Sequence, residues 1–412
     1  MKQNLDTYLK SHEQALVRFL QQLLAIPTEN PPGADYAKCT DFLVASLRQI
    51  GLTARRYRVP ETECRRILGE NRGFPRYNVV GRWKTGAAET LHFNGHYDVV
   101  PAGDGWRFGP FNPKVEKGWI YGRGTSDMKG SLAALWFAVG ALKACGIKPA
   151  CNVEVSFTAD EESDSRLGVG HILKERIVRP HYAVVCEGGG RGTLCYGHNG
   201  KLWYDVVVYG KSAHAARPEN GVNAFEKMAQ LVEDLQKYKR LIRRRSFTNL
   251  NGEKMYPSLT MGGRFDGSPE GKVNSIPGRA SFTLDRRLVP SEKVEPARLE
   301  LEDWITRAAR KIEPARIELI RHPAYEPCFV DPRHRLPETF IAAASAVRRS
   351  PVGKKTSFGF NDMHFFAERG IPVIGYGAQG ENDHGVDERI RIREIMTTAR
   401  TYARFLAEWP GA

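Results

Sequence analysis

The feature that most constrains the fold is an alternation of short apolar runs with helical segments along the first half of the chain. The apolar runs over 153–157 and 183–186 have the length of buried strands, and a segment of helical periodicity, 131–145, precedes them. Strands that alternate with helices predict a sheet covered by helices. We therefore expect an α/β fold whose large domain holds a mixed, mainly parallel sheet flanked by helices.

The pattern changes after Gly200. Six segments then follow in the order strand, helix, strand, strand, helix, strand, at 202–209, 222–238, 258–265, 279–284, 297–312 and 317–321. This is the order of a ferredoxin-like α+β sandwich. From about Tyr325 the α/β pattern resumes. We therefore predict a large domain in two parts, 1–199 and 323–412, with a smaller domain inserted over 200–322.

Net charge narrows the classes of partner. The chain has 61 Lys and Arg residues against 47 Asp and Glu residues, a formal charge of +14. This balance favours nucleic acid, an anionic surface or a small acidic substrate. The densest basic run, 237–245, is typical of a solvated helix end, with a polyanion contact as the alternative. No nucleic-acid-binding motif accompanies it, so we expect no nucleic-acid partner.

Cysteine spacing and hydropathy indicate the compartment. The seven cysteines are scattered and form no C-x-x-C pair, which predicts neither a disulfide framework nor a thiolate zinc site. The first 13 residues are polar and lack the apolar stretch of a signal peptide. No apolar run approaches the roughly 20 residues of a membrane span. We expect a cytoplasmic protein with no membrane partner.

Acidic and imidazole side chains follow the predicted strands at five points, 94–101, 121–130, 159–162, 186–190 and 381–387. Because α/β proteins expose their sites at the carboxyl ends of the strands, we expect these side chains to gather there. Together they supply two imidazoles and three carboxylates, and no thiolate. Such a donor set suits Zn²⁺, Co²⁺ or Mn²⁺ in a two-metal hydrolytic site.

Taken singly, each point also has a plainer interpretation. His96 and Asp98 form an H-x-D pair of a kind that is common in proteins. Asp127 has the position of a helix N-cap. The adjacent carboxylates Glu161 and Glu162 fit either a solvated acidic turn or one metal ligand beside one general base. These alternatives stay open when each motif is taken alone.

In chain order, however, the motifs resemble a known family. The set H-Y-D-V-V-P, G-R-G-T-S-D-M-K-G, T-A-D-E-E, C-E-G and D-H-G is similar to that of the dinuclear zinc metallopeptidases and amidohydrolases, the family of acetylornithine deacetylase, succinyl-diaminopimelate desuccinylase, aminoacylase and carboxypeptidase G. The resemblance covers essentially the whole chain. It implies a catalytic role for the large domain and a lid or dimerisation role for the inserted domain.

The resemblance implies a site with two divalent metal ions, zinc first, with cobalt or manganese as alternatives. His96 and Glu187 would bind one ion, Glu162 and His384 would bind the other, and Asp127 would bridge both.

Two further carboxylates receive roles from the same resemblance. Asp98 would orient His96. Glu161 would be the general base, which takes a proton from the attacking water and passes it to the leaving amine.

The inserted domain also matches the family. Its segment 210–224 resembles the lid-domain motif, which implies that His214 stabilises the oxyanion, often across a dimer. A homodimer through the inserted domain is therefore expected. Asn274 and Arg287 fall where relatives bind substrate, and an Arg holds a carboxylate well.

Two stretches depart from the family pattern. Asn361 replaces a serine, and the turn 376–378 lacks a proline. We therefore do not assign the substrate of any one relative to this chain.

A Glu at position 187 is typical of the deacylases and carboxypeptidases of the family. We therefore expect hydrolysis of the amide bond of an N-acyl amino acid or similar small carboxylate, as in a deacetylase or desuccinylase. A carboxypeptidase or dipeptidase is the alternative enzyme. A catalytically silent binding protein on the same fold is the alternative of another class.

Overall fold

A computed structural model of the chain describes residues 4–69, 73–268 and 271–411. The chain divides into two compact units. The first unit comprises Met1–Gly197, Val330–Lys355 and Asn361–Ala412, and the second comprises His198–Phe329 and Thr356–Phe360. Each unit has its own hydrophobic core. A lid or dimerisation role for the second unit stays a prediction.

The first unit is built on a mixed sheet with the strand order β1-β2-β6-β3-β7-β19-β8, and β18 pairs with β8. The neighbours β6, β3, β7 and β19 run parallel, whereas β1, β2 and β8 pair antiparallel. The central part of the sheet is therefore parallel, as the alternation of strands and helices predicts. The strands are β1 (Thr53–Arg58), β2 (Tyr77–Trp83), β3 (Thr90–His96), β6 (Asn152–Thr158), β7 (Tyr182–Val185), β8 (Thr193–His198), β18 (Gly353–Ser357) and β19 (Val373–Gly375).

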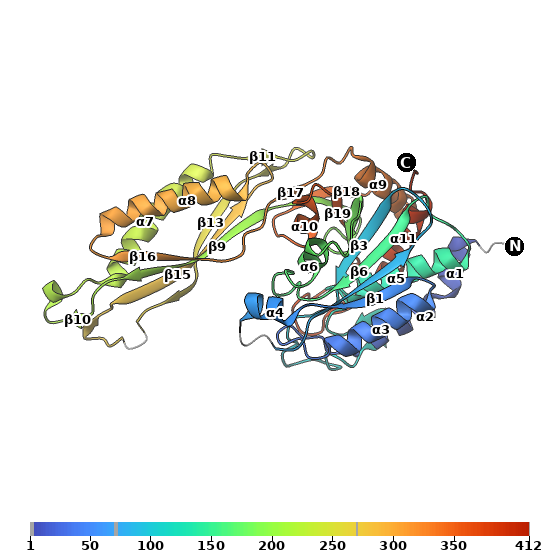
Figure 1. Ribbon diagram of the computed structural model, residues 1–412, viewed down its shortest axis with the longest axis horizontal. Helices are drawn as coiled ribbons and strands as arrows, with labels where there is room; N and C mark the ends of the chain where they lie inside the picture. The colour runs from blue at the N-terminus through green and yellow to red at the C-terminus, as the bar shows by residue number, and fades with distance from the viewer. Residues whose placement is uncertain (1–3, 70–72, 269–270, 412) are drawn as a thin grey trace. The chain divides into compact units, whose positions relative to one another are not determined.

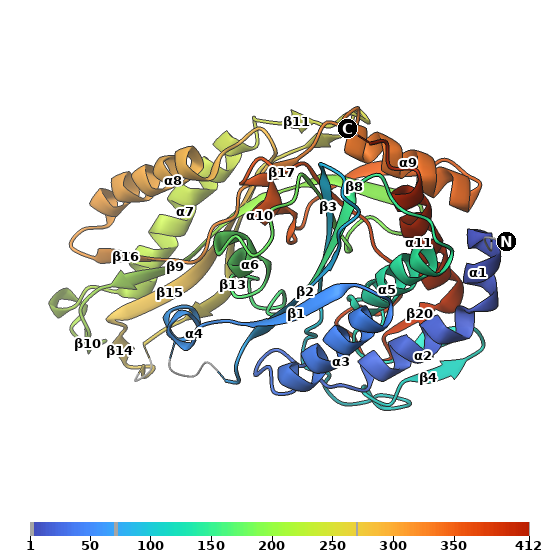
Figure 2. The ribbon, with the colours of Figure 1, turned by 45° about the vertical axis from the view of Figure 1, so that its right-hand side comes forward.

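Helices cover this sheet (Figure 1). They are α1 (Leu5–Ser11), α2 (Glu13–Leu24), α3 (Tyr36–Gln49), α4 (Glu61–Leu68), α5 (Lys129–Ala144), α6 (Val169–Lys174), α9 (Arg335–Arg348), α10 (Met363–Ala367) and α11 (Ile392–Ala407). Helix α5 is apolar on nearly every side and lies in the core, where it packs against α11 (Figure 2). A small antiparallel sheet joins β4 (Lys114–Glu116), β5 (Trp119–Tyr121) and β20 (Arg389–Arg391).

The first helix differs from its sequence prediction. The spacing of leucines predicts one helix that ends before Pro27, but the structure has two, α1 and α2, with His12 between them. The hydroxyl of Ser11 and Nδ1 of His12 each contact the carbonyl of Tyr8, at 3.1 and 2.9 Å. Side chains that bond to nearby backbone compete with the helical ladder, which accounts for the break.

The second unit holds an antiparallel sheet, β13-β15-β9-β16, with α7 and α8 on one face (Figure 1). Its elements are β9 (Gly200–Tyr209), α7 (Ala224–Ile242), β13 (Ser258–Asp266), β15 (Arg279–Leu288), α8 (Val294–Ala309) and β16 (Arg316–Arg321). They follow the expected order. Short pieces complete the chain: β10 (Ala213–His214), β11 (Phe247–Thr248), β12 (Lys254–Met255), β14 (Ser275–Ile276), β17 (Cys328–Phe329), and the 3₁₀ turns Pro218–Asn220 and Arg310–Ile312.

The basic run 237–245 lies at the end of α7 and just beyond it. Part of its charge is paired inside the same unit, because Arg245 lies 2.6 Å from Glu300 and Lys237 lies 3.6 Å from Asp234. In the part of the chain that the structure describes, no helix combines the length and apolarity needed to cross a bilayer.

Candidate metal centre

The carboxyl ends of three neighbouring parallel strands carry the predicted acidic and imidazole side chains. Strand β3 ends at His96, which is in register with Thr158 at the end of β6, just before Glu161 and Glu162. Strand β7 pairs with β3 and is followed by Glu187. The parallel register therefore brings these groups to one edge of the sheet, as expected from their positions after strands.

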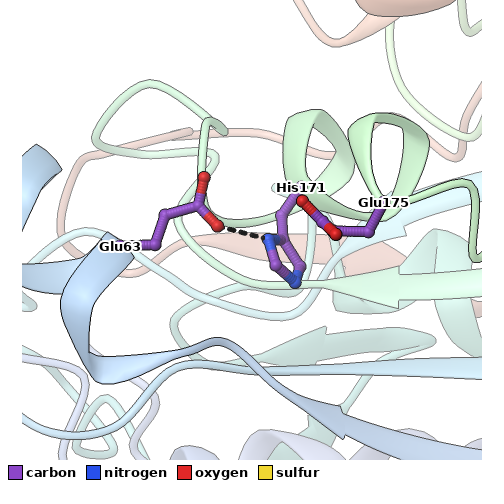
Figure 3. Close-up of side chains that lie close together, drawn as sticks. All are labelled: Glu63, His171 and Glu175. Atoms are coloured by element: carbon purple, nitrogen blue, oxygen red, sulfur yellow. Dashed lines mark hydrogen bonds and ion pairs between the residues drawn. The ribbon is translucent and has the colours of Figure 1, made fainter.

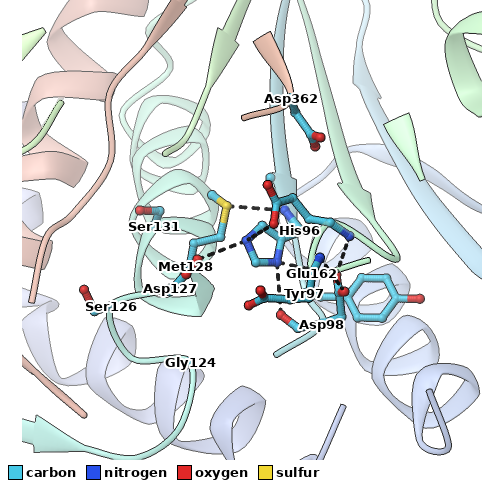
Figure 4. A network of polar contacts seen from close by, with 12 residues as sticks. His96, Tyr97, Asp98, Gly124, Ser126, Asp127, Met128, Ser131, Glu162 and Asp362 are labelled. Atoms are coloured by element: carbon cyan, nitrogen blue, oxygen red, sulfur yellow. Dashed lines mark hydrogen bonds and ion pairs between the residues drawn. The ribbon is translucent and has the colours of Figure 1, made fainter. Parts of the chain in front are cut away.

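Asp127 lies between two imidazoles. Its Oδ1 is 3.1 Å from Nε2 of His96, and its Oδ2 is 3.1 Å from Nε2 of His384. Helix α5 begins at Lys129, with Met128 at the N-cap and no side-chain cap (Figure 4). The carboxylate of Asp127 is thus turned to the histidines rather than to the helix end, and each of its oxygens faces a different nitrogen donor.

The glutamates complete the cluster. Nε2 of His384 lies 3.4 Å from Oε2 of Glu162, and Nε2 of His96 lies 4.0 Å from Oε2 of Glu161. Ligand atoms of His96, Asp127 and Glu162 lie within 4.8 Å of one another. Among the described residues, the buried atoms Oε1 of Glu162 and Oε2 of Glu187 accept no hydrogen bond. Buried oxygens without donors, beside imidazole nitrogens, fit a site for divalent cations.

The electrostatics of the cluster also favour a cation. Burial, and then the neighbouring carboxylate of Asp127, raise the pKa of Glu187 to about 8. Burial, with Glu187 as the next cause, raises the pKa of Glu161 well above its usual value. Hydrogen bonds with Asp127 and Glu162 raise the pKa of His384 to about 10. Carboxylates this close repel one another, and a divalent cation would relieve that repulsion.

Asp98 contacts more than His96, the histidine that it is predicted to orient. Nδ1 of His96 lies 3.0 Å from the main-chain oxygen of Asp98 and 3.4 Å from its carboxylate. The same carboxylate accepts the backbone N–H groups of Glu161 and Glu162, both at 3.2 Å, and the amide of Asn30 at 2.9 Å. Asp98 therefore holds the loop that carries the two glutamates, which sequence reasoning missed.

The residue before that glutamate pair is itself fixed by a buried network. Asp160 has a left-handed φ of +63°, which is rare for a residue with a side chain. Its carboxylate accepts from Nε of Arg76 at 2.8 Å, from the hydroxyl of Tyr36 at 3.1 Å and from Asn30 at 3.2 Å. These partners come from distant segments, so no local pattern indicates them.

Glu388 is a further group that sequence reasoning missed. Its buried carboxylate accepts the N–H groups of Gly124, Ser126 and Asp127, at 2.8, 2.7 and 3.1 Å. It also accepts from Arg123 at 2.9 Å, and Arg123 in turn donates to the carbonyl of His384 at 3.2 Å. This ion pair ties the loop that presents Asp127 to the loop that presents His384.

The turn after β19 closes another side of the cluster. A Cβ on Gly377 would lie 2.3 Å from the carbonyl oxygen of Cys186, so only glycine allows this approach. Asn361, at the position where the family resemblance leads us to expect a serine, accepts the N–H of Met363 at 3.1 Å and shapes the start of α10. The asparagine at this position is therefore accommodated by local structure.

His214, Asn274 and Arg287 belong to the second unit. The pairing of β10 with β14 sets His214 opposite Ser275, next to Asn274, whose carbonyl accepts the N–H of Ala215 at 2.9 Å. The guanidinium of Arg287 donates to Asp285 from Nε and Nη2, both at 2.9 Å. A substrate carboxylate would therefore share Arg287 with an acidic neighbour.

A second group of ligand-type side chains, Glu63, His171 and Glu175, lies on α4 and around α6 (Figure 3). Nδ1 of His171 is 2.9 Å from Glu63, whose other oxygen is 2.6 Å from Nζ of Lys174. Because the ammonium of Lys174 already neutralises the half-buried Glu63, this group is an ion-pair cluster.

Comparison with known proteins decides the family. Residues 92–408 match peptidase family M20/M25/M40. A succinyl-diaminopimelate desuccinylase of Stenotrophomonas maltophilia is 30% identical over 401 residues, which cover 93% of this chain and 96% of that protein. The chain belongs to peptidase family M20/M25/M40. The resemblance seen in the motifs is thereby confirmed, and this M20 chain is a metal-dependent enzyme that acts on amide bonds.

Solved structures share the fold of this M20 chain. A metallo-carboxypeptidase of Sulfolobus solfataricus superposes with a TM-score of 0.75 at 20% identity, over 96% of this chain and 99% of the other. A Bacillus subtilis protein described as a dinuclear metal-binding peptidase gives a TM-score of 0.65 at 15% identity, over 97% and 98% of the two chains. The mixed α/β architecture is therefore that of the family.

Proposed function

We propose that this M20 enzyme hydrolyses the amide bond of an N-acyl amino acid or a similar small carboxylate, and that it releases the acyl group as a carboxylic acid together with a free amine. The observation that carries the proposal is the position of Asp127, whose two carboxylate oxygens each lie 3.1 Å from a different histidine. A carboxylate placed in this way suits two cations at once.

The donor set suits two divalent metal ions, zinc first, with Co²⁺ and Mn²⁺ as alternatives. His96 and Glu187 are proposed to hold one ion, Glu162 and His384 the other, and Asp127 both. The orphaned oxygens of Glu162 and Glu187 support this assignment, because both are buried and lack hydrogen-bond donors among the described residues. When bound, the ions supply Lewis acidity toward the scissile carbonyl and lower the pKa of water.

Glu161 is proposed as the general base. It stands beside His96 without lying within direct bonding distance, since the closest approach is 4.0 Å. Its raised pKa suits a group that takes a proton from the attacking water and then gives it to the leaving nitrogen as the C–N bond breaks. Asp98 positions this base through the backbone N–H of Glu161.

The second unit is proposed to supply substrate contacts. His214 would stabilise the negative charge that develops on the carbonyl oxygen, and Asn274 and Arg287 would bind the substrate. A homodimer through this unit belongs to the same proposal. These roles rest on the family resemblance, and the neighbouring positions of His214 and Asn274 across the β10–β14 pair support them.

The relatives suggest two enzyme classes for this chain, and these have to be distinguished. The curated relatives matched over most of the chain are desuccinylases, which favours an acyl-amino acid substrate. The structural relatives include a metallo-carboxypeptidase and a yeast dipeptidase, so peptide hydrolysis on the same site is the second candidate.

A metal-reload screen tests the proposal. Purified protein is stripped with a chelator, reloaded with Zn²⁺, Co²⁺ or Mn²⁺, and assayed for amine released from N-acetyl and N-succinyl amino acids and from dipeptides. Turnover that returns with metal on the acyl amino acids supports the proposal. Turnover on dipeptides alone would replace it with the peptidase alternative, and a protein that binds no metal would refute the assigned ligands.

A further inference from the structure

A small cavity opens beside the proposed metal ligands, within the first unit. It has a volume of about 170 Å³, and both Asp127 and Glu187 line it. Pockets that enclose a whole small ligand measure roughly 300–1,000 Å³. A cavity of this size holds one functional group of a substrate rather than the whole molecule.

The cavity has one cationic side chain, Lys355, on strand β18. Its ammonium lies 3.3 Å from the carbonyl oxygen of Gly189. Within the ranges that the structure describes, Lys355 forms no ion pair with a carboxylate. An ammonium has three donors, so hydrogens remain for a ligand after the bond to Gly189 is made.

Two serine hydroxyl groups of the cavity also keep a hydrogen that they can donate. The hydroxyl oxygens of Ser126 and Ser131 accept the N–H groups of Gly380 and Ala378, at 2.8 and 2.9 Å. Each hydroxyl therefore still has its own hydrogen to give. Figure 4 shows both serines on the side where Asp127 lies.

The acidic groups of the cavity do not cancel its preference for an anionic ligand. Asp127 and Glu187 are proposed metal ligands, so bound cations would neutralise them, and Asp383 is exposed at the rim. Lys355 then remains as the uncompensated charge of the cavity wall.

We propose that this cavity, with Lys355 as its cation, is a subsite for a carboxylate of the substrate, which makes Lys355 a specificity-determining residue. The inference rests on the proposed amidohydrolase function and narrows it to substrates that carry a carboxylate away from the scissile bond. That carboxylate belongs either to the acyl part, as in a succinyl group, or to the amino acid part.

Paired substrates distinguish the two sources. An N-succinyl amino acid against the N-acetyl form of the same amino acid tests the acyl side. The N-acyl amino acid against its carboxamide tests the amine side. One of these pairs contains the carboxylate that Lys355 recognises. For that pair, Lys355→Gln should raise the KM of the charged substrate by about 10-fold or more, because a charge-assisted contact is lost. The KM of the neutral substrate should change by less than about 2-fold.

Matched variants separate charge from structure. Lys355→Gln keeps a donor for the carbonyl of Gly189, and Lys355→Arg keeps the charge and should restore most of the affinity. Lys354→Gln makes the same change of net charge on the neighbouring residue of β18, which faces the other side of the strand, and should leave both KM values near wild type.

Binding gives a readout that does not need turnover. Calorimetric titration of the zinc-loaded protein with succinate, acetate, the free amino acid and its amide should show at least about 10-fold weaker binding of one carboxylate probe in Lys355→Gln. Equal losses for charged and neutral ligands, or an equal effect of Lys354→Gln, would refute the subsite. A protein without turnover on any acyl amino acid would refute the proposed function, while these titrations would still decide the role of Lys355.

Discussion

At the scale of single residues, the carboxylates of the candidate centre have different surroundings, which supports the different tasks proposed for them. Asp127 is hydrogen-bonded to two imidazoles, which hold its pKa below the usual range although burial acts the other way. Glu161, by contrast, has burial and the nearby Glu187 carboxylate as the leading causes of its raised pKa. Environments that separate carboxylate pKa values in this way support the proposed division between Asp127 as a metal ligand and Glu161 as the proton carrier.

Replacing Glu161 tests this division. The variant Glu161→Gln keeps the shape of the side chain but cannot take a proton, so kcat should fall by about 10²–10⁴-fold. Metal content, measured by elemental analysis, should stay near that of wild type, because Glu161 is not assigned as a ligand. Glu175→Gln, at an exposed carboxylate outside the centre, serves as the control. Retention of most of the activity in Glu161→Gln would remove the base from the mechanism.

At the scale of elements, loops position the proposed metal ligands, and buried polar groups hold these loops. Glu388 gathers three backbone N–H groups of the segment that carries Asp127, and its partner Arg123 reaches the carbonyl of His384. The first turn of α5 is packed equally tightly, because a Cβ on Gly130 would lie 2.3 Å from the carbonyl oxygen of Thr125. The geometry around Asp127 thus depends on residues that carry no reaction chemistry.

The variant Glu388→Gln is expected to weaken metal binding by about 10–100-fold, the range found when residues that orient metal ligands are replaced. Competition with a chelating dye measures this affinity. Glu394→Gln is the matched control, since Glu394 also binds an arginine, Arg348, at 2.6 Å, and, among the described residues, it has no hydrogen bond or ion pair to a loop that carries a proposed ligand. Equal affinity in the wild type and Glu388→Gln would show that the loop holds its shape without this carboxylate.

The variant Gly130→Ala is expected to destabilise the protein by about 1–3 kcal/mol, because the added methyl group has no space beside Thr125. Urea unfolding followed by circular dichroism measures the loss. Gly353→Ala is the control, since its nearest neighbour would lie at an ordinary 3.6 Å and its stability should change by less than about 0.5 kcal/mol. Equal midpoints for the two variants would contradict the packing argument.

At the scale of the whole molecule, the chain consists of two units with separate cores, and every proposed metal ligand lies in the first. Without cations, the first unit must hold several half-buried carboxylates against their mutual repulsion. Cations that bind only the folded site should therefore stabilise that unit by mass action.

Metal removal should show this stabilisation directly. When the free metal concentration is about 100-fold above Kd, the free energy of unfolding should rise by about 2.7 kcal/mol. Calorimetry should show this as a higher unfolding temperature for the metal-loaded protein than for the protein in chelator. Hydrogen exchange should slow around β3 and the start of α5 on metal addition and stay unchanged in α7 and β15. If metal slowed hydrogen exchange equally in both units, this would contradict a metal centre built from the first unit alone.

The sequence by itself determined the α/β alternation of the first unit, the order of the main strands and helices of the second unit, the family, and the residue types available at the predicted strand ends. These features are local: periodicity, turn residues and short motifs act within a few positions along the chain. The sequence also supplied both interpretations of Asp127, as helix cap and as ligand, without deciding between them.

Only the tertiary structure decided which groups meet. The contacts of Asp127 with His384, of Glu388 with the Asp127 loop and of Arg76 with Asp160 join residues 257, 261 and 84 positions apart. Lys355 likewise meets Gly189 across 166 positions. No local pattern specifies such pairs, because they depend on how strands order themselves in the sheet. The register of β3, β6 and β7 places His96 and the segments that carry Glu161, Glu162 and Glu187 at one edge of the sheet.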